Sequence, residues 1–402
     1  MDSRLAADEP EFTRGTAAIG PVAAGLCSTL VGIGLGRFAY SALIPVLIEH
    51  GWFSATDAVY LGAANLAGYL IGAVSARWAT HLAPTRLTIR LTMLAVCASF
   101  FACTFPLPFA WFFFWRLVSG IGGGVLMILA PSLVLSRVAP SLRGLAGGVM
   151  FAGVGVGIVG SATVVPLLAD AGPDSAWLAL GAIALAATVA TWMAWPDSEP
   201  GRTSFGQTAA LSSPAARFRV HILSAAYGLA ALGLVAHMVF LVDYVARGLG
   251  RGLDAAALCW ALFGVGAVLG PVIAGRIADR FGFGPTIRAL LLAEALGVGV
   301  LVWTATPTVL AVSSLLVGAL VPGLVPVALG RVRELLETEA ARRAGWSTAT
   351  AAFALGQGAG GYGFSYLFGV TGDYRLLFAV GAAAVALGLV IDLAGNRRGR
   401  PG

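Results

Sequence analysis

The chain has 402 residues, of which 58% are hydrophobic and only 11% are charged. Because soluble domains carry about 25% charged residues, this composition excludes an ordinary soluble protein and indicates an integral membrane protein. The formal net charge is +6, and every one of the 25 basic residues is an arginine.

Twelve apolar runs follow one another along the chain. Each is at least as long as the roughly 20 residues that cross a hydrocarbon core about 30 Å thick, and the longer runs allow for tilt. We therefore predict an all-α integral membrane fold with twelve transmembrane helices. The runs cover residues 17–49, 58–80, 86–105, 108–136, 142–169, 175–195, 219–246, 255–278, 285–305, 307–331, 344–370 and 374–394.

The opening segment and the cysteines exclude some other classes. The first residues are polar and acidic rather than basic, so we expect no cleaved signal peptide. The cysteines stand singly inside apolar runs, without the paired spacing of a metal site or a disulfide framework. We predict that they are packing residues and that the protein holds no metal and no cofactor. They are Cys27, Cys97, Cys103 and Cys259.

The first run contains "GRFAYSALIP", which places Arg37 inside an apolar segment. An arginine at the centre of a membrane helix costs roughly 2.5 to 3.5 kcal/mol, so it normally faces a bundle interior or an aqueous cavity. Arg37 therefore needs a partner or a ligand. Tyr40 follows in the same run, and the second run, with "ANLAGYLIGA", adds Asn65 and Tyr69 as candidates for the same cavity. Asn65 is equally suited to a hydrogen bond between helices.

Glycines mark close helix contacts in the fourth and fifth runs. The fourth contains "RLVSGIGGG", and small residues at this spacing let a neighbouring helix approach closely. Its arginine, Arg116, is either a charge of the cavity or a structural pin for helix packing. The glycines predicted to serve helix packing are Gly120, Gly122 and Gly124 in the fourth run and Gly153 and Gly157 in the fifth.

A long polar segment divides the chain into two halves. It joins the sixth and seventh runs, and echoes across it suggest a duplication. "GAVSARWA" from Gly72 recurs as "GRIADRFG" from Gly275, an offset of 203 residues. We predict a tail at 1–16, a six-helix bundle at 17–195, a linker at 196–218, a second bundle at 219–394 and a tail at 395–402.

The arginines are distributed unevenly between the two sides of the membrane. If the twelve spans alternate, one set of loops and both tails hold twenty arginines, while the opposite loops hold Arg247, Arg251 and Arg375. The positive-inside rule then places both termini in the cytoplasm and the chain in the cytoplasmic (inner) membrane. The excess of basic charge reports membrane orientation, so we expect no nucleic-acid partner.

Several motifs resemble signatures of the major facilitator superfamily. "GRIADRFG" is similar to its loop signature G-x-L-A-D-R-x-G, and "RLVSGIGGG" to its R-x-x-x-G-x-G-x-G signature. The first two runs resemble the YbfB/YjiJ-type branch. The resemblance implies two pseudo-symmetric six-helix bundles around a central cavity that the first and seventh helices line.

The resemblance also implies a conformational latch in the cytoplasmic loops. Asp279 and Arg280 take the roles of the family's latching pair, whereas Ala76 replaces the aspartate in the first-half copy. The latch residues implied are Gly72, Arg77, Gly275, Asp279, Arg280 and Gly282.

In the fifth run Gly144, like Gly153 and Gly157, keeps the spacing of the antiporter signature, but Ile158 replaces its proline.

The offset of 203 aligns Arg37 with Phe240, one turn from both His237 and Asp243. We therefore predict that Asp243 or His237 meets Arg37 across the pseudo-two-fold axis. Each has a structural alternative, since His237 suits a bundle interior and Asp243 suits the outer surface beside Arg247.

Two further polar residues lie in later runs. Gln357, in the eleventh, is a candidate for substrate contact or for a hydrogen bond between helices. Glu294, in the ninth, is interpreted as a protonated or lipid-interface carboxylate rather than a coupling site.

The predicted function is secondary active transport of a small organic solute, an anion or another polar molecule, by alternating access. Arg37 and Arg116 would attract the anion, and protonation of Asp243 or His237 would couple transport to protons. The expected partners are the small-molecule substrate, protons and the lipid bilayer, with the protein as a monomer.

The alternatives are a multidrug or metabolite efflux antiporter of the same fold, a non-transporting membrane receptor and a polytopic membrane enzyme. An enzyme would need a catalytic constellation such as H-E-x-x-H or G-x-S-x-G, and the sequence contains neither. We therefore expect no enzymatic activity.

Overall fold

The computed structural model of the protein describes residues 11–135, 137–138, 143–197 and 213–397, and in these ranges it is built from helices without strands. The first half contains α1 (Glu11–Thr29), η1 (Leu30–Ala39), α2 (Tyr40–Glu49), α3 (Ala55–Leu82), α4 (Thr85–Ala102), α5 (Phe109–Leu135), α6 (Arg143–Leu168) and α7 (Pro173–Ala190). The second contains α8 (Pro214–Asp243), η3 (Tyr244–Gly248), α9 (Gly252–Phe281), α10 (Phe283–Trp303), α11 (Pro307–Leu335), α12 (Glu339–Thr371) and α13 (Tyr374–Arg397).

These elements form twelve long helical rods. In the first rod α1, η1 and α2 run on continuously, and in the seventh α8 continues into η3. In the described part of the chain, eleven rods are long and apolar enough to cross a membrane. The remaining rod, α12, is less apolar than the others because it is rich in glycine, alanine, serine and threonine. It packs along α8 and α3 and completes the set of twelve.

Some helices extend beyond the apolar runs that predicted them. Helix α1 begins at Glu11, six residues before the predicted start of the first bundle at residue 17. Helix α8 begins at Pro214, inside the predicted linker. The Ser213 side chain accepts a hydrogen bond from the Ala216 backbone N–H and so caps this helix in a polar segment. The predicted linker residues 198–212 and tail residues 1–10 and 398–402 lie outside the described residues.

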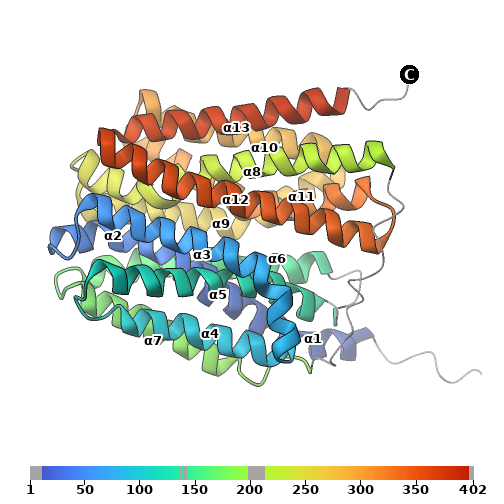
Figure 1. The fold of residues 1–402 in the computed structure, drawn as a ribbon, viewed down its shortest axis with the longest axis horizontal. Helices are drawn as coiled ribbons and strands as arrows, with labels where there is room; N and C mark the ends of the chain where they lie inside the picture. Colours follow the sequence, from blue (N-terminus) through green and yellow to red (C-terminus); the bar gives the residue numbers. More distant parts are fainter. Residues whose placement is uncertain (1–10, 136, 139–142, 198–212, 398–402) are drawn as a thin grey trace, which may run out of the picture.

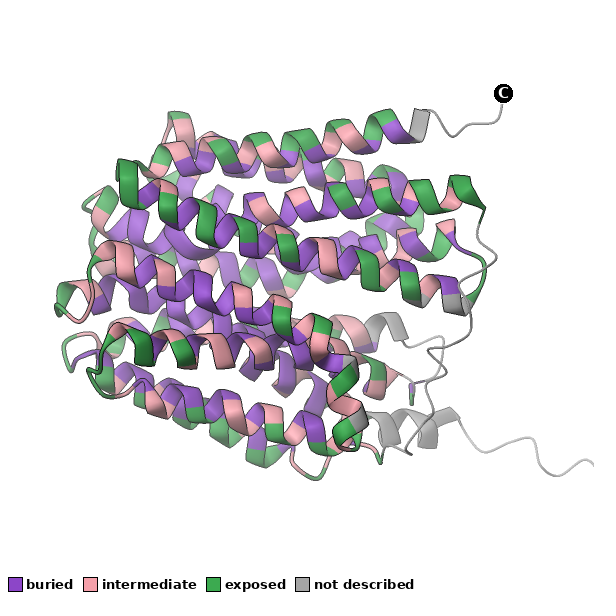
Figure 2. Cartoon of the chain, in the orientation of Figure 1, coloured by how far each residue is buried: buried purple, intermediate pink, exposed green. Residues whose placement is uncertain are grey.

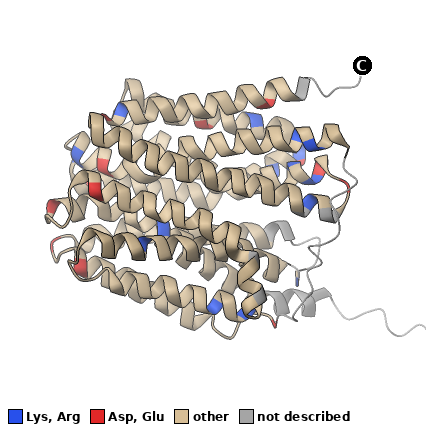
Figure 3. Ribbon diagram, in the orientation of Figure 1, with Lys and Arg blue, Asp and Glu red and all other residues tan. Residues whose placement is uncertain are grey.

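The rods gather into two bundles that lie side by side (Figure 1), one of α1–α7 and one of α8–α13. Helix α12 of the second bundle packs on α3 of the first, α9 packs on α6, and α8 packs on α2. Figure 2 shows buried residues where the bundles meet and exposed residues on the outward faces. Many exposed residues are large and apolar, including Leu82, Leu167 and Trp303, as lipid contact requires. Charged residues lie mainly near the two ends of the helices (Figure 3).

Glycines bring helix backbones together within the first bundle. A Cβ atom added at any of the five glycines named for packing would lie less than 3.0 Å from an atom of a neighbouring helix. Gly120 faces the backbone of Asn65, Gly124 faces Tyr69, and Gly153 faces Leu26. Gly122 faces Val96, and Gly157 faces Gly34. Helices α3 and α5 therefore meet along their backbones, which fixes the height of Asn65 and Tyr69 relative to Arg116.

Candidate substrate site

The first rod departs from α-helical geometry where it carries Arg37. Residues Leu30–Ala39 form a π-helix, a rare geometry that is frequent at functional sites. The Gly36 carbonyl accepts three side-chain hydrogen bonds, from Asn65 Nδ2 at 3.1 Å, Arg116 Nη1 at 2.9 Å and Ser119 Oγ at 3.1 Å. Side chains of α3 and α5 thus hold the backbone immediately before Arg37.

Arg116 and Tyr40 belong to this support. The Arg116 guanidinium lies 4.2 Å from the centre of the Tyr40 ring, and its side chain is buried. The Tyr40 hydroxyl donates to the Ala58 carbonyl at 2.7 Å, and Asn65 Nδ2 also donates to the Arg116 carbonyl at 3.2 Å. Of the two readings of Arg116, this geometry favours a structural pin that adds positive charge beside the site.

Arg37 lies between the two bundles and keeps donors free. Its guanidinium lies 4.1 Å from the centre of the Tyr69 ring, and Nη1 donates to Gln357 Oε1 of α12 at 2.7 Å. Gln357 Nε2 contacts the sulfur of Met238 on α8 at 3.6 Å. Arg37 Nε and Nη2 are buried and have no hydrogen-bond partner in the described part of the chain. No ion pair of the described residues includes Arg37 or Arg116, so the site carries positive charge without a compensating carboxylate.

The structure does not pair Arg37 with His237 or Asp243, contrary to our prediction. His237 Nε2 lies 2.8 Å from Ser313 Oγ, and its ring lies against Phe378 at 5.2 Å, so it faces the interior of the second bundle. Asp243 accepts hydrogen bonds from Arg247 Nε at 2.5 Å and from the Tyr374 hydroxyl. The offset between the halves gives the height of these residues but not their rotation about the helix axis.

Asp243→Asn is expected to lower stability while leaving transport intact. The substitution removes the partner of Arg247, whose side chain is 27% exposed and so retains some solvation. We expect a loss of about 1–2 kcal/mol, which a melting curve in detergent measures. Exposed Asp254 in the first turn of α9 provides the control, and Asp254→Asn should leave the melting temperature unchanged. A transport defect in Asp243→Asn without loss of stability would return Asp243 to the coupling residues.

The hydrogen bonds that join described residues of the two bundles lie in the middle of the molecule and toward the α2–α3 loop. Besides Arg37 and Gln357, Ser41 donates to the Met238 carbonyl, Ser365 to the Val59 carbonyl at 3.3 Å, and Trp260 Nε1 to Ser161 Oγ at 3.3 Å. Phe38 also packs between Trp260 and Phe263, with ring centres 6.1 Å apart in each pair. These hydrogen bonds and ring contacts therefore hold the two bundles together on the side of the α2–α3 loop.

Of the predicted latch residues, those of the second bundle lie at the opposite end of α9. Asp279 and Arg280 are exposed, and no ion pair of the described residues includes them. Gly282 ends α9 and begins α10 with φ +85°, a conformation that favours glycine. Gly275 has open space around its Cβ position, whereas Gly72 packs against the backbone of Ile121. The Arg77 side chain lies outside the described part.

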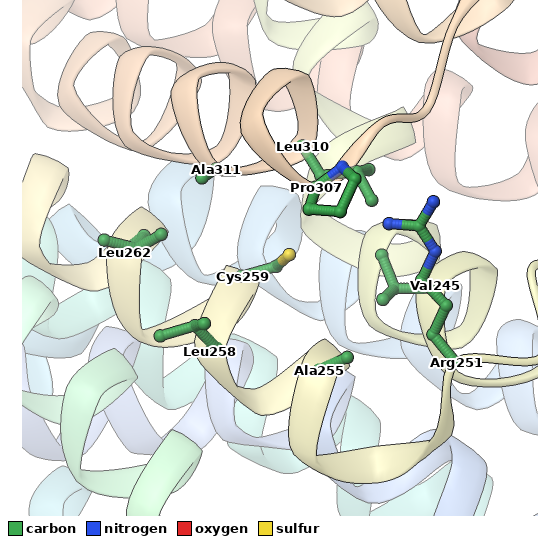
Figure 4. A pocket seen from close by; sticks show the side chains of 9 residues that line it. All are labelled: Val245, Arg251, Ala255, Leu258, Cys259, Leu262, Pro307, Leu310 and Ala311. Atoms are coloured by element: carbon green, nitrogen blue, oxygen red, sulfur yellow. The ribbon is translucent and has the colours of Figure 1, made fainter.

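One cavity opens at the N-terminal ends of α9 and α11 (Figure 4), and Arg37 is not among its lining residues. Its walls are apolar except for Arg251, whose Nη2 donates to the Ala305 carbonyl at 2.6 Å. The lining residues are Val245, Arg251, Ala255, Leu258, Cys259, Leu262, Pro307, Leu310 and Ala311.

Six of the eight predicted site residues converge at or beside Arg37, namely Arg37, Tyr40, Asn65, Tyr69, Arg116 and Gln357. Sequence reasoning missed Ser119 and the Gly36 carbonyl. Ser119 follows Arg116 by three residues, so helical spacing alone places the two on one face. Nothing in the sequence marks a backbone carbonyl as an acceptor for three side chains.

Comparison with known protein families identifies the family to which this chain belongs. The family described as "Uncharacterised MFS-type transporter YbfB" matches residues 29–393, nearly the whole chain. The chain belongs to this family of major facilitator transporters. It is therefore a multi-pass membrane protein, and the family points to a transporter rather than an enzyme. No curated protein matches the sequence.

Solved structures show the same fold for this transporter. It is similar to the xylose transporter XylE from E. coli in a partially occluded inward-open conformation, with TM-score 0.72 and 15% identity over 93% of this chain and 97% of the other. It is also similar to a D-xylose-proton symporter, with TM-score 0.71 and 18% identity over 94% and 96% of the two chains. The all-α fold of twelve helices in two six-helix bundles is thus confirmed.

Proposed function

We propose that this transporter is a proton-coupled secondary carrier of a small organic anion. The observation that carries the proposal is Arg37, a buried guanidinium between the bundles with two unused donors and no carboxylate partner in the described residues. A carboxylate is the group that matches such a donor pair, because two parallel N–H···O bonds fit its two oxygens. Arg116 adds a second positive charge nearby, which favours an anion over a neutral solute or an amine.

The position of Arg37 suits alternating access. Arg37 belongs to the first bundle and Gln357 to the second, so an anion at Arg37 would change the bond that joins them. A ligand shifts a conformational equilibrium only through different contacts in the two states, and this bond provides such a difference. We infer that the described conformation is closed toward the outside and that rocking of the bundles would expose Arg37 there.

Orientation and coupling rest on separate support. Twenty arginines on one set of loops and tails favour cytoplasmic termini and the cytoplasmic membrane. Proton coupling is supported by the fold shared with the D-xylose-proton symporter. Because Asp243 and His237 are held away from Arg37, neither is the coupling residue that we favour.

A flux assay in proteoliposomes tests the proposed function. Purified protein is reconstituted with an internal pH-sensitive dye, and lactate, succinate, gluconate, xylose and a lipophilic amine are added in turn. We expect substrate-dependent proton movement with at least one of the acids and none with xylose or the amine. Proton movement with xylose alone would assign a sugar carrier, and movement with the amine alone would assign drug efflux.

A further inference from the structure

Helix α10 carries a buried carboxyl group that the proposed function does not use. Glu294 has 0% of its surface exposed, and neither carboxyl oxygen has a hydrogen-bond partner in the described part of the chain. It lies eleven residues after the start of α10 at Phe283 and nine before its end at Trp303. At 1.5 Å per residue it is about 16 Å from one end and about 14 Å from the other. Glu294 is therefore at the middle of the membrane.

The other buried carboxylates of the described chain are ion-paired. Asp243 pairs with Arg247, and Asp392 of α13 accepts a hydrogen bond from Arg288 Nε at 2.6 Å. No ion pair of the described residues includes Glu294. Because an unpaired charge in this position is very costly, Glu294 is held here as the neutral, protonated acid.

Helices α8, α9, α11 and α13 pack against α10. From α8 the buried titratable groups are Tyr227 and His237, besides the ion-paired Asp243. His237 Nε2 lies 2.8 Å from Ser313 Oγ of α11, whose hydroxyl donates to the Gly297 carbonyl of α10 at 2.6 Å. From α9 the buried titratable group is the Cys259 thiol.

The other charged groups of α10, α11 and α13 whose side chains are described are ion-paired or, like Arg333 and Arg375, exposed. Arg288 of α10 forms an ion pair with Asp392 of α13. Arg331 and Glu334 of α11 form an ion pair with each other near the end of that helix. In the described part of the chain, the surrounding helices therefore supply no charge that is paired with Glu294.

Helix α8 connects the helix of Glu294 to the candidate substrate site. It packs against α10, which carries Glu294, and against α12, which carries Gln357. The Tyr227 ring of α8 lies 4.6 Å from that of Phe353 on α12, one helical turn before Gln357, the partner of Arg37. A shift of α8 on a change of charge at Glu294 would therefore be transmitted to the helix that contacts Arg37.

We propose that Glu294 is the proton-binding residue of this carrier. On deprotonation the O–H bond of the acid breaks, the carboxylate keeps the electron pair, and the proton passes to water. The net change is one carboxyl proton lost and one proton released, without electron transfer. The assignment deepens the proposed function and rests on it for the link to transport.

Infrared spectroscopy of purified protein without any organic substrate tests the site directly, with the proton as probe. At neutral pH we expect the C=O stretching band of a protonated carboxylic acid, which disappears in Glu294→Gln and persists in the control Glu334→Gln, a partly exposed carboxylate of α11. A folded wild-type protein without the band, or a band that persists in Glu294→Gln, would overturn the assignment.

A second variant keeps the test decisive even if Glu294→Gln fails to fold. Glu294→Asp retains a carboxyl group on a shorter side chain, so the band should remain and move in frequency. A band of unchanged frequency in folded Glu294→Asp would show that it does not arise from Glu294 and would overturn the assignment.

Transport then links the site to coupling. With lactate, succinate or gluconate, whichever the wild-type protein carries, Glu294→Gln should retain exchange of labelled for unlabelled acid and lose proton movement. Proton movement that persists in Glu294→Gln would refute the coupling role. If the wild-type protein carries none of the three acids, the proposed function fails while the infrared result still decides the protonation of Glu294.

Discussion

Replacing Arg37 by glutamine is expected to abolish transport of organic acids at the substrate concentrations at which the wild-type protein transports them. The variant loses the charge and the two free donors that match a carboxylate. Loss of one partner of a buried charge-assisted pair costs about 2–4 kcal/mol, which is about 30- to 1,000-fold in affinity. The measurement is binding and uptake of the acid found in the flux assay.

Two further substitutions test whether Arg37 binds the substrate, one at its partner Gln357 and one at a control arginine. Gln357→Glu would place a carboxylate where Arg37 now donates at 2.7 Å, so it should compete with the substrate and inhibit acid transport. Arg251→Gln removes an exposed arginine outside the candidate substrate site and should leave transport unchanged. If Arg37→Gln transports acids as well as the Arg251→Gln control does, Arg37 does not bind the substrate.

Gly120→Ala is expected to destabilise the first bundle strongly. An added Cβ would overlap the Asn65 carbonyl oxygen on α3, and this atom belongs to a helix backbone that cannot rotate away. Overpacking of this kind costs about 1–3 kcal/mol. The same shift of α3 would move Asn65 away from the Gly36 carbonyl, so substrate affinity should fall together with the melting temperature.

The control is another helical glycine with room for a methyl group. Gly147 on α6 has no atom within 4 Å of its Cβ position. Gly147→Ala should raise stability by up to about 1 kcal/mol, because alanine is the better helix former. Equal melting temperatures for the two variants would show that α3 and α5 do not depend on close approach at Gly120.

The sequence predicted the twelve rods because a membrane imposes a minimum apolar length on each of them. The same constraint marked Arg37 and Arg116 as residues of the interior, since neither is tolerated toward lipid. Helix α12 is the instructive case, because its small polar residues lower its apolarity while they allow it to pack closely against α8 and α3. Helix ends in polar segments, such as the start of α8, depend on local caps and were predicted less well.

Only the tertiary structure decided which residue meets Arg37. Its partner Gln357 is 320 residues away in the sequence, and their contact depends on the rotation and tilt of two helices in different bundles. His237 and Asp243 lie one helical turn on either side of Phe240, and they contact Ser313 and Arg247 rather than Arg37. The sequence by itself determined that charge is buried in this membrane protein, because apolar length and the cost of burial are local properties. Which groups surround that charge is set by packing between distant helices, and no local pattern encodes it.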